Sequence, residues 1–173
     1  NLSAYDSAGV PKSFLFNGIN DYIEITDSSD IDFTTEPFTW SGWINLTSVG
    51  DPQCWIGGGH YAWAIKVNSA ALLQFSEIDS GADSNSNKTL SVDTWYHIAV
   101  VTDFTESTST NKVKFYVDGV QVTTATMALD GSFSAGGTYT IRKNGRPSGS
   151  QEFFGGYCSD FAIYDEALAS GGV

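Results

Sequence analysis

An alternation of apolar and polar side chains with a period of two residues runs through most of this chain and constrains its fold more than any other feature. In residues 38–46 (FTWSGWINL) the even positions form an apolar face, and residues 113–117 (VKFYV) alternate up to Asp118-Gly119, a pair typical of tight hairpin turns. Further short strand-like segments are residues 14–16, 22–25, 120–123, 138–141 and 161–164. The pattern predicts an all-β chain of about ten to fourteen strands, spaced as in a two-sheet sandwich.

Length and composition fit one folded domain. The chain has 173 residues, of which 41% are hydrophobic and 14% aromatic, and this is enough to bury a full core. The polar stretches 80–88 and 105–111 are each bracketed by strands, so we expect them to be loops and not linkers. We therefore expect a single domain over residues 1–173.

Charge restricts the partners and the setting. Eight Lys and Arg residues stand against 20 Asp and Glu, a formal net charge of −12, which disfavours nucleic acid and anionic membranes as partners. No apolar run approaches the roughly 20 residues of a membrane-spanning helix, so no span is expected. Only 16% of the residues are charged, and a surface of Ser and Thr suits an extracellular, cell-surface or virion protein.

The two cysteines, Cys54 and Cys158, give neither a disulfide framework nor a metal-binding spacing. We expect two buried thiols. A bridge between them would require Cα atoms within about 7 Å.

Five motifs in sequence order resemble the compact laminin-G-like, concanavalin A-like domains. They are residues 16–25 (FNGINDYIEI), 38–44 (FTWSGWI), 95–101 (WYHIAVV), 115–119 (FYVDG) and 156–168. The resemblance covers nearly the whole chain and implies a jelly-roll sandwich of two curved antiparallel sheets. Most motif residues, among them Trp40, Trp95 and His97, are expected to be core or scaffold. Such folds host many functions, so the fold alone does not name one.

The same architecture carries retaining glucanases, whose strand pattern is close to Glu-x-Asp-x-x-Glu. In residues 77–82 the first two acids match, as Glu77 and Asp79, but the third position is Ala82. Asp83 follows one residue late, and a slip of one residue turns a strand side chain to the opposite face. Without a second carboxylate no proton reaches the leaving group. We therefore expect no enzymatic activity, and a glycoside hydrolase is the least favoured function.

Sugars are bound by aromatic faces together with planar polar side chains. Residues 54–66 (CWIGGGHYAWAIK) offer Trp55, His60, Tyr61 and Trp63 around a triple glycine, and these four are the first candidate ligand contacts. The alternative is that Trp55 and Trp63 belong to the core of a hairpin. We expect about two of the four side chains to be exposed, since strand positions alternate between faces.

A second candidate site is the basic segment 142–146 (RKNGR). Arg142 and Arg146, with Asn144 between them, have the geometry to grip a carboxylate or sulfate of an acidic sugar. The alternative is an ordinary solvated turn, or one paired with nearby acids.

The resemblance also implies a structural Ca²⁺ beside the first and last strands, since domains of this family often hold one. Asn20 and Asp160 are the candidate ligands. The family's acid falls on Ser159 in this chain, and Asp160 follows one residue later, so its side chain is expected on the other face.

Two functions follow from these observations. The first is a non-catalytic recognition module that binds a glycan or another surface ligand, or acts in adhesion, within a larger extracellular or virion surface protein. The second is a structural decoration domain of a virion or surface layer, with structural proteins of that assembly as partners. An exposed aromatic cleft favours binding, whereas a large flat apolar patch favours assembly.

Overall fold

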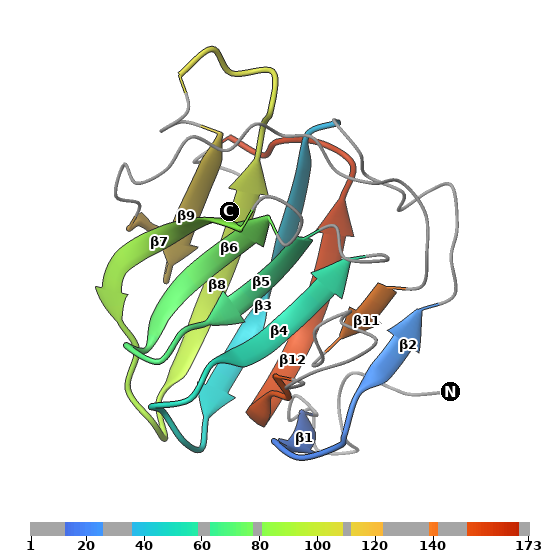
Figure 1. Cartoon of the computed structure of the whole chain (residues 1–173), viewed down its shortest axis with the longest axis vertical. Helices are drawn as coiled ribbons and strands as arrows, with labels where there is room; N and C mark the ends of the chain where they lie inside the picture. The colour runs from blue at the N-terminus through green and yellow to red at the C-terminus, as the bar shows by residue number, and fades with distance from the viewer. Residues whose placement is uncertain are drawn as a thin grey trace, which may run out of the picture.

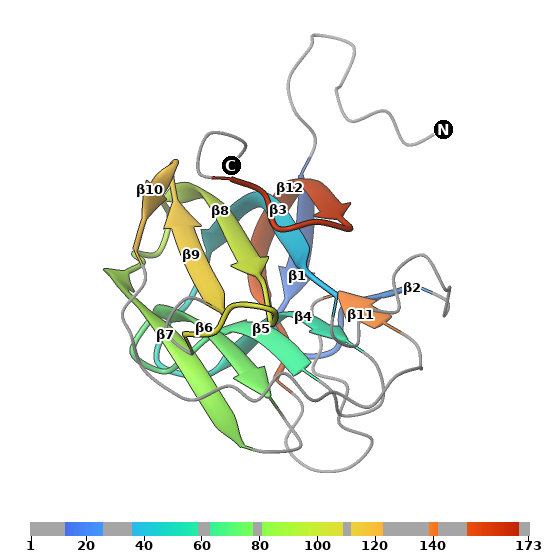
Figure 2. The same ribbon diagram turned by 90° about the horizontal axis from the view of Figure 1, so that it is seen from above.

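The computed structural model describes residues 13–25, 36–58, 63–77, 81–108, 112–122, 139–141 and 152–169. These residues form twelve strands in two six-stranded sheets that face each other (Figures 1 and 2). Every strand pairing within the sheets is antiparallel. The predicted all-β jelly-roll sandwich is therefore confirmed. The described part of the chain contains no helix with the length and hydropathy needed to cross a membrane.

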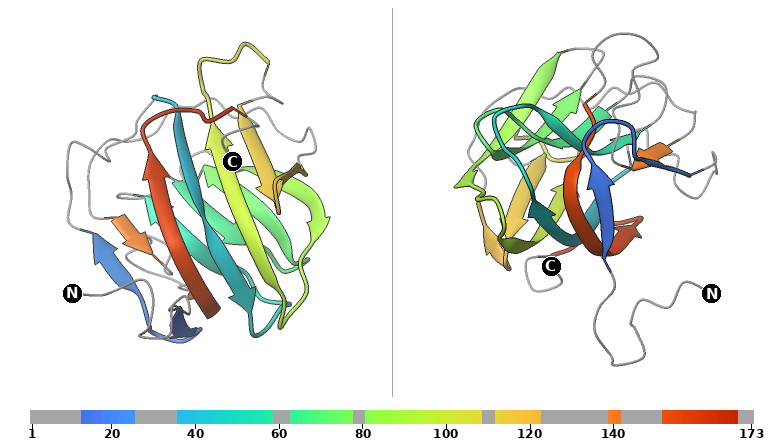
Figure 3. Two further views of the ribbon diagram at one scale, coloured as in Figure 1. Left: turned by 180° about the vertical axis from the view of Figure 1, so that it is seen from behind. Right: turned by 90° about the horizontal axis from the view of Figure 1, so that it is seen from below.

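One sheet, called here the β3 sheet, contains in spatial order β1 (Phe14–Asn17), β12 (Gly155–Tyr164), β3 (Phe38–Leu46), β8 (Trp95–Thr102), β9 (Val113–Val117) and β10 (Val120–Gln121). The other, the β5 sheet, contains β2 (Ile23–Ile25), β11 (Tyr139–Ile141), β4 (Gln53–Gly58), β5 (Trp63–Val67), β6 (Leu72–Glu77) and β7 (Ala82–Thr89). Figure 3 (left) looks onto the outer face of the β3 sheet, where β12, β3, β8 and β9 lie side by side.

The hairpin between β9 and β10 forms where Asp118-Gly119 predicts it. Both residues have positive φ angles, 51° and 75°, as a tight hairpin turn requires. The Asp118 carboxylate also accepts a hydrogen bond from the backbone N–H of His97 at 2.9 Å, and the Asp118 N–H donates to the His97 carbonyl at 2.8 Å. The turn is thereby tied to the neighbouring strand β8.

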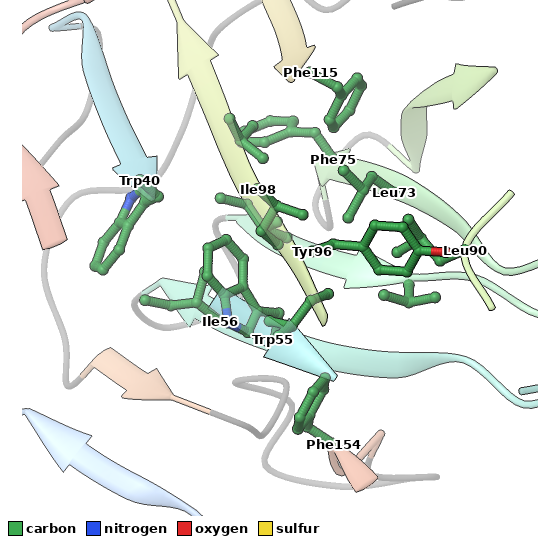
Figure 4. Packing of buried hydrophobic residues seen from close by; sticks show 14 of the residues in the cluster. Trp40, Trp55, Ile56, Leu73, Phe75, Leu90, Tyr96, Ile98, Phe115 and Phe154 are labelled. Carbon is green, nitrogen blue, oxygen red and sulfur yellow. The ribbon is translucent and has the colours of Figure 1, made fainter. Parts of the chain in front are cut away.

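The core lies between the two sheets and is rich in aromatic rings (Figure 4). Trp63 occupies its middle, stacked on Phe75 at 6.0 Å and 14° and in contact with Phe38 at 5.0 Å between ring centroids. The even positions of β3 point into this core, as the alternation predicts. Cys54 and Cys158 are both buried and form no disulfide, which confirms the prediction for them.

The segment after β12, residues 165–169, closes over one end of the outer face of the β3 sheet. The buried Thr39 hydroxyl donates to the Glu166 carbonyl at 2.7 Å and accepts from the Leu168 N–H at 3.0 Å. Ala167 packs on a small cluster formed by Ala99, Val101 and Tyr116. Burial raises the pKa of the Tyr116 phenol above its usual value of 10.0.

We expect Thr39→Val to destabilise the fold by about 1–3 kcal/mol, because the Glu166 carbonyl and the Leu168 N–H both lose their hydrogen bond to the buried hydroxyl. Thr39→Ser keeps the hydroxyl and loses one methyl group, so it should lose only about 1 kcal/mol. Urea unfolding of the two variants measures the difference. Equal destabilisation by Val and Ser would show that the hydroxyl does not hold this segment in place.

Candidate functional site: an aromatic face on the β3 sheet

Two of the predicted ligand contacts, Trp55 and Trp63, are core residues. Their side chains are 0% and 1% exposed, so neither ring has a face free for a sugar. Trp55 packs edge-on against Phe161 at 5.7 Å, and Trp63 stacks on Phe75. This corrects the prediction that these rings contact a ligand. The reason is that β4 and β5 lie inside the β5 sheet, and these positions face the β3 sheet. This agrees with the alternative that both tryptophans belong to the core of a hairpin.

The other predicted contacts, His60, Tyr61, Arg142, Asn144 and Arg146, lie outside the described residues. Their proposed roles in binding stay predictions.

The predicted calcium ligands Asn20 and Asp160 do not share a site. β1 and β12 run antiparallel with Asn17 opposite Gly155, so the turn that carries Asn20 adjoins the beginning of β12. Asp160 lies five residues further along that strand, about 16 Å away at ordinary strand rise. This corrects the pairing of the two residues as metal ligands. Among the described residues, no three His, Cys, Asp or Glu side chains gather as a metal site would.

The Asn and Asp residues of the first family motif instead build a turn. The side-chain oxygen of Asn17 accepts from the N–H groups of Ile19, Asn20 and Asp21 at 2.8, 3.0 and 3.2 Å. Asp21 in turn accepts from the Asn17 N–H at 3.0 Å, and Asn20 accepts from the Asn17 amide at 2.7 Å. These oxygens are occupied by donors of the chain itself, as is typical of Asx turns. The residues present therefore fit a structural turn better than a cation site.

The acids tested for glucanase chemistry lie on opposite faces of the β5 sheet. Glu77 is buried on the core side, directly opposite Trp63 on β5 and Ala82 on β7. Asp83 is opposite Ser76 and accepts a hydrogen bond from its hydroxyl at 2.5 Å. The predicted slip of Asp83 to the other face is confirmed, so Glu77 and Asp83 do not form the closely spaced pair of a retaining enzyme. Asp79 lies outside the described residues.

The outer face of the β5 sheet is polar, and its side chains bond to one another. The side-chain oxygen Oδ1 of Asn85 accepts hydrogen bonds from the side-chain amides of Asn68 at 3.0 Å and Gln74 at 2.9 Å. Lys66 pairs with Glu152 at 3.4 Å. The side chains bonded to Asn85 tie β6, β7 and the turn after β5 together.

Half-exposed aromatic rings gather instead on the outer face of the β3 sheet. Trp43, Trp95 and Tyr157 are 39%, 42% and 37% exposed. The strand register places Trp43 directly opposite His97, and places Asn45 between Tyr157 on β12 and Trp95 on β8. We call these five residues the aromatic face. It occupies the end of the sheet at which β8 and β12 begin, away from the segment after β12.

The rings of the aromatic face support one another. Trp95 and Tyr157 approach to 6.3 Å between centroids at 50°, on either side of the buried Asn45. Trp43 meets His97 edge to face at 5.4 Å and 65°. Such contacts favour fixed ring orientations. The part of each ring that is exposed is then held in a constant position for a ligand.

The loop before Trp95 is anchored at several points. Asp93 donates its N–H to the Leu46 carbonyl at 2.9 Å, and Ser91 donates to the Tyr96 hydroxyl at 3.2 Å. Burial alone would raise the pKa of the Tyr96 phenol, but hydrogen bonds from Ser91 and Thr94 and the charge of Lys88 outweigh it, and the pKa lies below 10.0. The start of β8 is therefore held in place.

Trp40 is a core residue as expected, whereas Trp95 is exposed and does not belong to the core. Tyr96 and Ile98 point into the core, so the odd positions of β8 must point outward. The same parity puts Trp43 outward, because Trp40 and Ile44 are core residues. The alternation of apolar positions in the sequence already indicated that Trp43 and Trp95 point outward, but the family motifs favoured a core or scaffold interpretation.

The two facing sheets with their aromatic face define a lectin-like β-sandwich. The laminin G model of the concanavalin A-like lectin/glucanases superfamily matches residues 17–173. The chain belongs to this superfamily, and the resemblance of its motifs is thereby confirmed.

Solved structures share the fold at low sequence identity. A "putative carbohydrate binding protein" from Bacteroides ovatus has a TM-score of 0.68 at 18% identity, over 95% of this chain and 47% of that chain. A sialidase from Trypanosoma rangeli has a TM-score of 0.66 at 14% identity, over 94% and 26%. A heptameric SAP-like pentraxin from Limulus polyphemus has 0.64 at 16%, over 91% and 77%. The chain thus spans less than half of the first two proteins. No curated protein sequence matches this chain.

Proposed function

We propose that this chain is a non-catalytic glycan-binding module and that the aromatic face receives the sugar. One observation carries the proposal: Trp43, Trp95, Tyr157 and His97 present partly exposed rings on one rigid sheet surface, with the Asn45 amide among them. The C–H face of a pyranose packs on such rings, and side-chain amides and hydroxyls bond to its hydroxyl groups.

Recognition of this kind uses neither a nucleophile nor a general acid. The register around Glu77 supports the non-catalytic part of the proposal, since Trp63 and Ala82 occupy the neighbouring strand positions. A rigid sheet surface also favours affinity, because few side chains must be ordered when the ligand arrives.

An extracellular or surface setting within a larger protein completes the proposal. It is supported by the low content of charged residues, 16%, and by the net charge of −12. Related folds occur within longer chains, as the 47% and 26% coverage of the Bacteroides ovatus and Trypanosoma rangeli proteins indicates.

A second candidate function, assembly with structural proteins of a virion or surface layer, is favoured by one further observation. Leu15 is 58% exposed and lies directly beside Tyr157 in the register, and Val92 is also exposed next to Leu46. Leu15 adds exposed apolar surface beside the aromatic face, and proteins use such surface to associate.

A broad glycan array, combined with sedimentation analysis of the free protein, tests the two functions. We expect a monomeric protein that binds one structural class of glycan. A protein that binds no glycan but self-associates through this face would overturn the glycan proposal and favour assembly. Binding that persists when the aromatic face is substituted would place the glycan elsewhere on the chain.

A further inference from the structure

We propose that the aromatic face selects neutral glycans and discriminates against their sialylated or sulfated forms. This inference rests on the proposed function, because it concerns the ligand of the same face. It comes from the charges that border the rings.

Three exposed carboxylates border the aromatic face. Asp118 is bonded to the backbone of His97, in the same row of the sheet as Trp43. The second carboxylate, that of Asp160, lies on the opposite border. It accepts a hydrogen bond at 3.1 Å from the hydroxyl of Ser159, the residue paired with Trp43 in the register. Asp93 lies two residues before Trp95 and is bonded through its N–H to Leu46.

The described lysines lie elsewhere. Lys66 is on the other sheet, paired with Glu152. Lys114 and Lys112 are at the beginning of β9, which is the opposite end of the β3 sheet, and Lys114 approaches Glu106 at 3.9 Å. Lys88 belongs to β7 in the other sheet, and its charge acts on Tyr96, a core-facing residue. Among the described residues, the charged side chains next to the rings are therefore acidic.

The electrostatic consequence is discrimination against anions. A sialic acid carboxylate or a sulfate is recognised by guanidinium or ammonium donors, usually in bidentate geometry. Here an anionic sugar would meet exposed carboxylates and the field of a chain with net charge −12. A neutral sugar meets the exposed rings and loses no binding free energy to this field. The inference differs from the prediction for Arg142 and Arg146, which concerns acidic sugars, and the test below separates the two.

The test is an array in which each neutral glycan is printed with its sialylated and sulfated forms, probed at low and high salt. We expect the bound glycans to be neutral and their anionic forms to bind at least about tenfold more weakly at low salt, with the ratio narrowing as salt screens the carboxylates. Asp118→Asn should bring the affinities for neutral and anionic glycans closer together at low salt. It keeps the hydrogen-bond acceptor for His97, and Asn accepts a positive φ angle. Asp103→Asn, which removes a charge at the opposite end of β8, should leave the ratio unchanged.

The outcomes separate the inference from the function on which it rests. Preferential binding of anionic glycans that is lost in a Trp43→Ala variant would overturn the neutral selectivity and leave the aromatic face as the site. Binding that is insensitive to Trp43→Ala would place the glycan elsewhere on the chain and overturn the selectivity of this face. No binding to any glycan would overturn the proposed function itself and the selectivity with it. An unchanged ratio in Asp118→Asn would remove the bordering carboxylates as the cause.

Discussion

Trp43→Ala is expected to weaken glycan binding at least about thirtyfold. Truncating an aromatic residue in the centre of a binding surface loses about 2 kcal/mol or more of binding free energy, and each 1.4 kcal/mol corresponds to about tenfold in Kd. Trp43 lies in the middle of its sheet, between β8 and β12, and its ring is held by contact with His97. Alanine removes both the stacking surface and the support for His97. Isothermal titration with the best glycan from the array measures the change in Kd.

The matched control is Tyr164→Ala. Tyr164 is also 39% exposed and lies on β12 of the same sheet, but it is paired with Thr39 at the far end, next to the segment after β12. We expect the glycan affinity of Tyr164→Ala to stay within about twofold of that of the unaltered chain, which is a change in binding free energy of less than about 0.5 kcal/mol. Near-ultraviolet circular dichroism and thermal unfolding check that both variants are folded. An equal loss of binding in the two variants would mean that the effect is not located at the aromatic face.

Gly156→Ala is expected to destabilise the fold by about 3–5 kcal/mol, a large part of the stability of an ordinary domain. Gly156 lies on β12 between β1 and β3, where it is paired with Phe16 and Leu46, and its φ angle is 151°. A Cβ atom at this position would collide with the carbonyl oxygen of Asn45 and would come within 3.1 Å of the Phe154 ring. Backbone from the neighbouring strand has no room to give way, so the strand pairing itself must shift. Urea unfolding measures the loss.

Gly119→Ala separates this collision from the effect of a positive φ angle alone. Gly119 has a φ of 75°, and a Cβ there would meet nothing within 4 Å. We expect a loss of only about 1–2 kcal/mol, the amount by which a left-handed conformation disfavours a side chain. Similar values for Gly119→Ala and Gly156→Ala would contradict the steric explanation. Because Gly156 precedes Tyr157, the same experiment reports how tightly the strand below the aromatic face is fixed.

Most of the fold could be predicted from the sequence because strand alternation is a local property that survives folding. The polar stretch 80–88 is an exception: it was expected to be a loop, but strand β7 occupies Ala82–Thr89. The even positions of β3, from Phe38 to Leu46, are buried in the structure. They are apolar side chains apart from Gly42, which gives room to the Trp55 ring. The hairpin at Asp118-Gly119 was equally predictable, since the two residues that tolerate positive φ angles are adjacent in the chain.

The candidate site was harder to predict because it depends on which face of each strand is covered. Alternation predicts which positions of a strand share a face, but it does not show that Trp63 points towards the other sheet. For β3 and β8 the opposite conclusion was available, since their apolar positions already identified the inward face and left Trp43 and Trp95 outside.

The pairing of Asn20 with Asp160 as metal ligands was wrong for a different reason. Asn20 lies in the turn after β1, Asp160 lies on the neighbouring strand β12, and the resemblance placed both near the first and last strands. The position of a residue along a strand pair depends on register, which alternation does not determine. With Asn17 opposite Gly155, the two side chains are separated by half the length of β12.

The position of the aromatic face on the outer surface of a sheet has a consequence for how such a module would act. Enclosed pockets bury about 70–90% of a small ligand, whereas a sugar lying on a sheet keeps one side in water. A single contact of this kind dissociates readily, and the strength of attachment would then depend on how many copies engage a repeating polysaccharide at once. Linked or clustered copies raise the overall avidity by about 10²–10⁴ without any new contact. Measured on an isolated chain, modest affinity would therefore be compatible with firm attachment by an array of such domains.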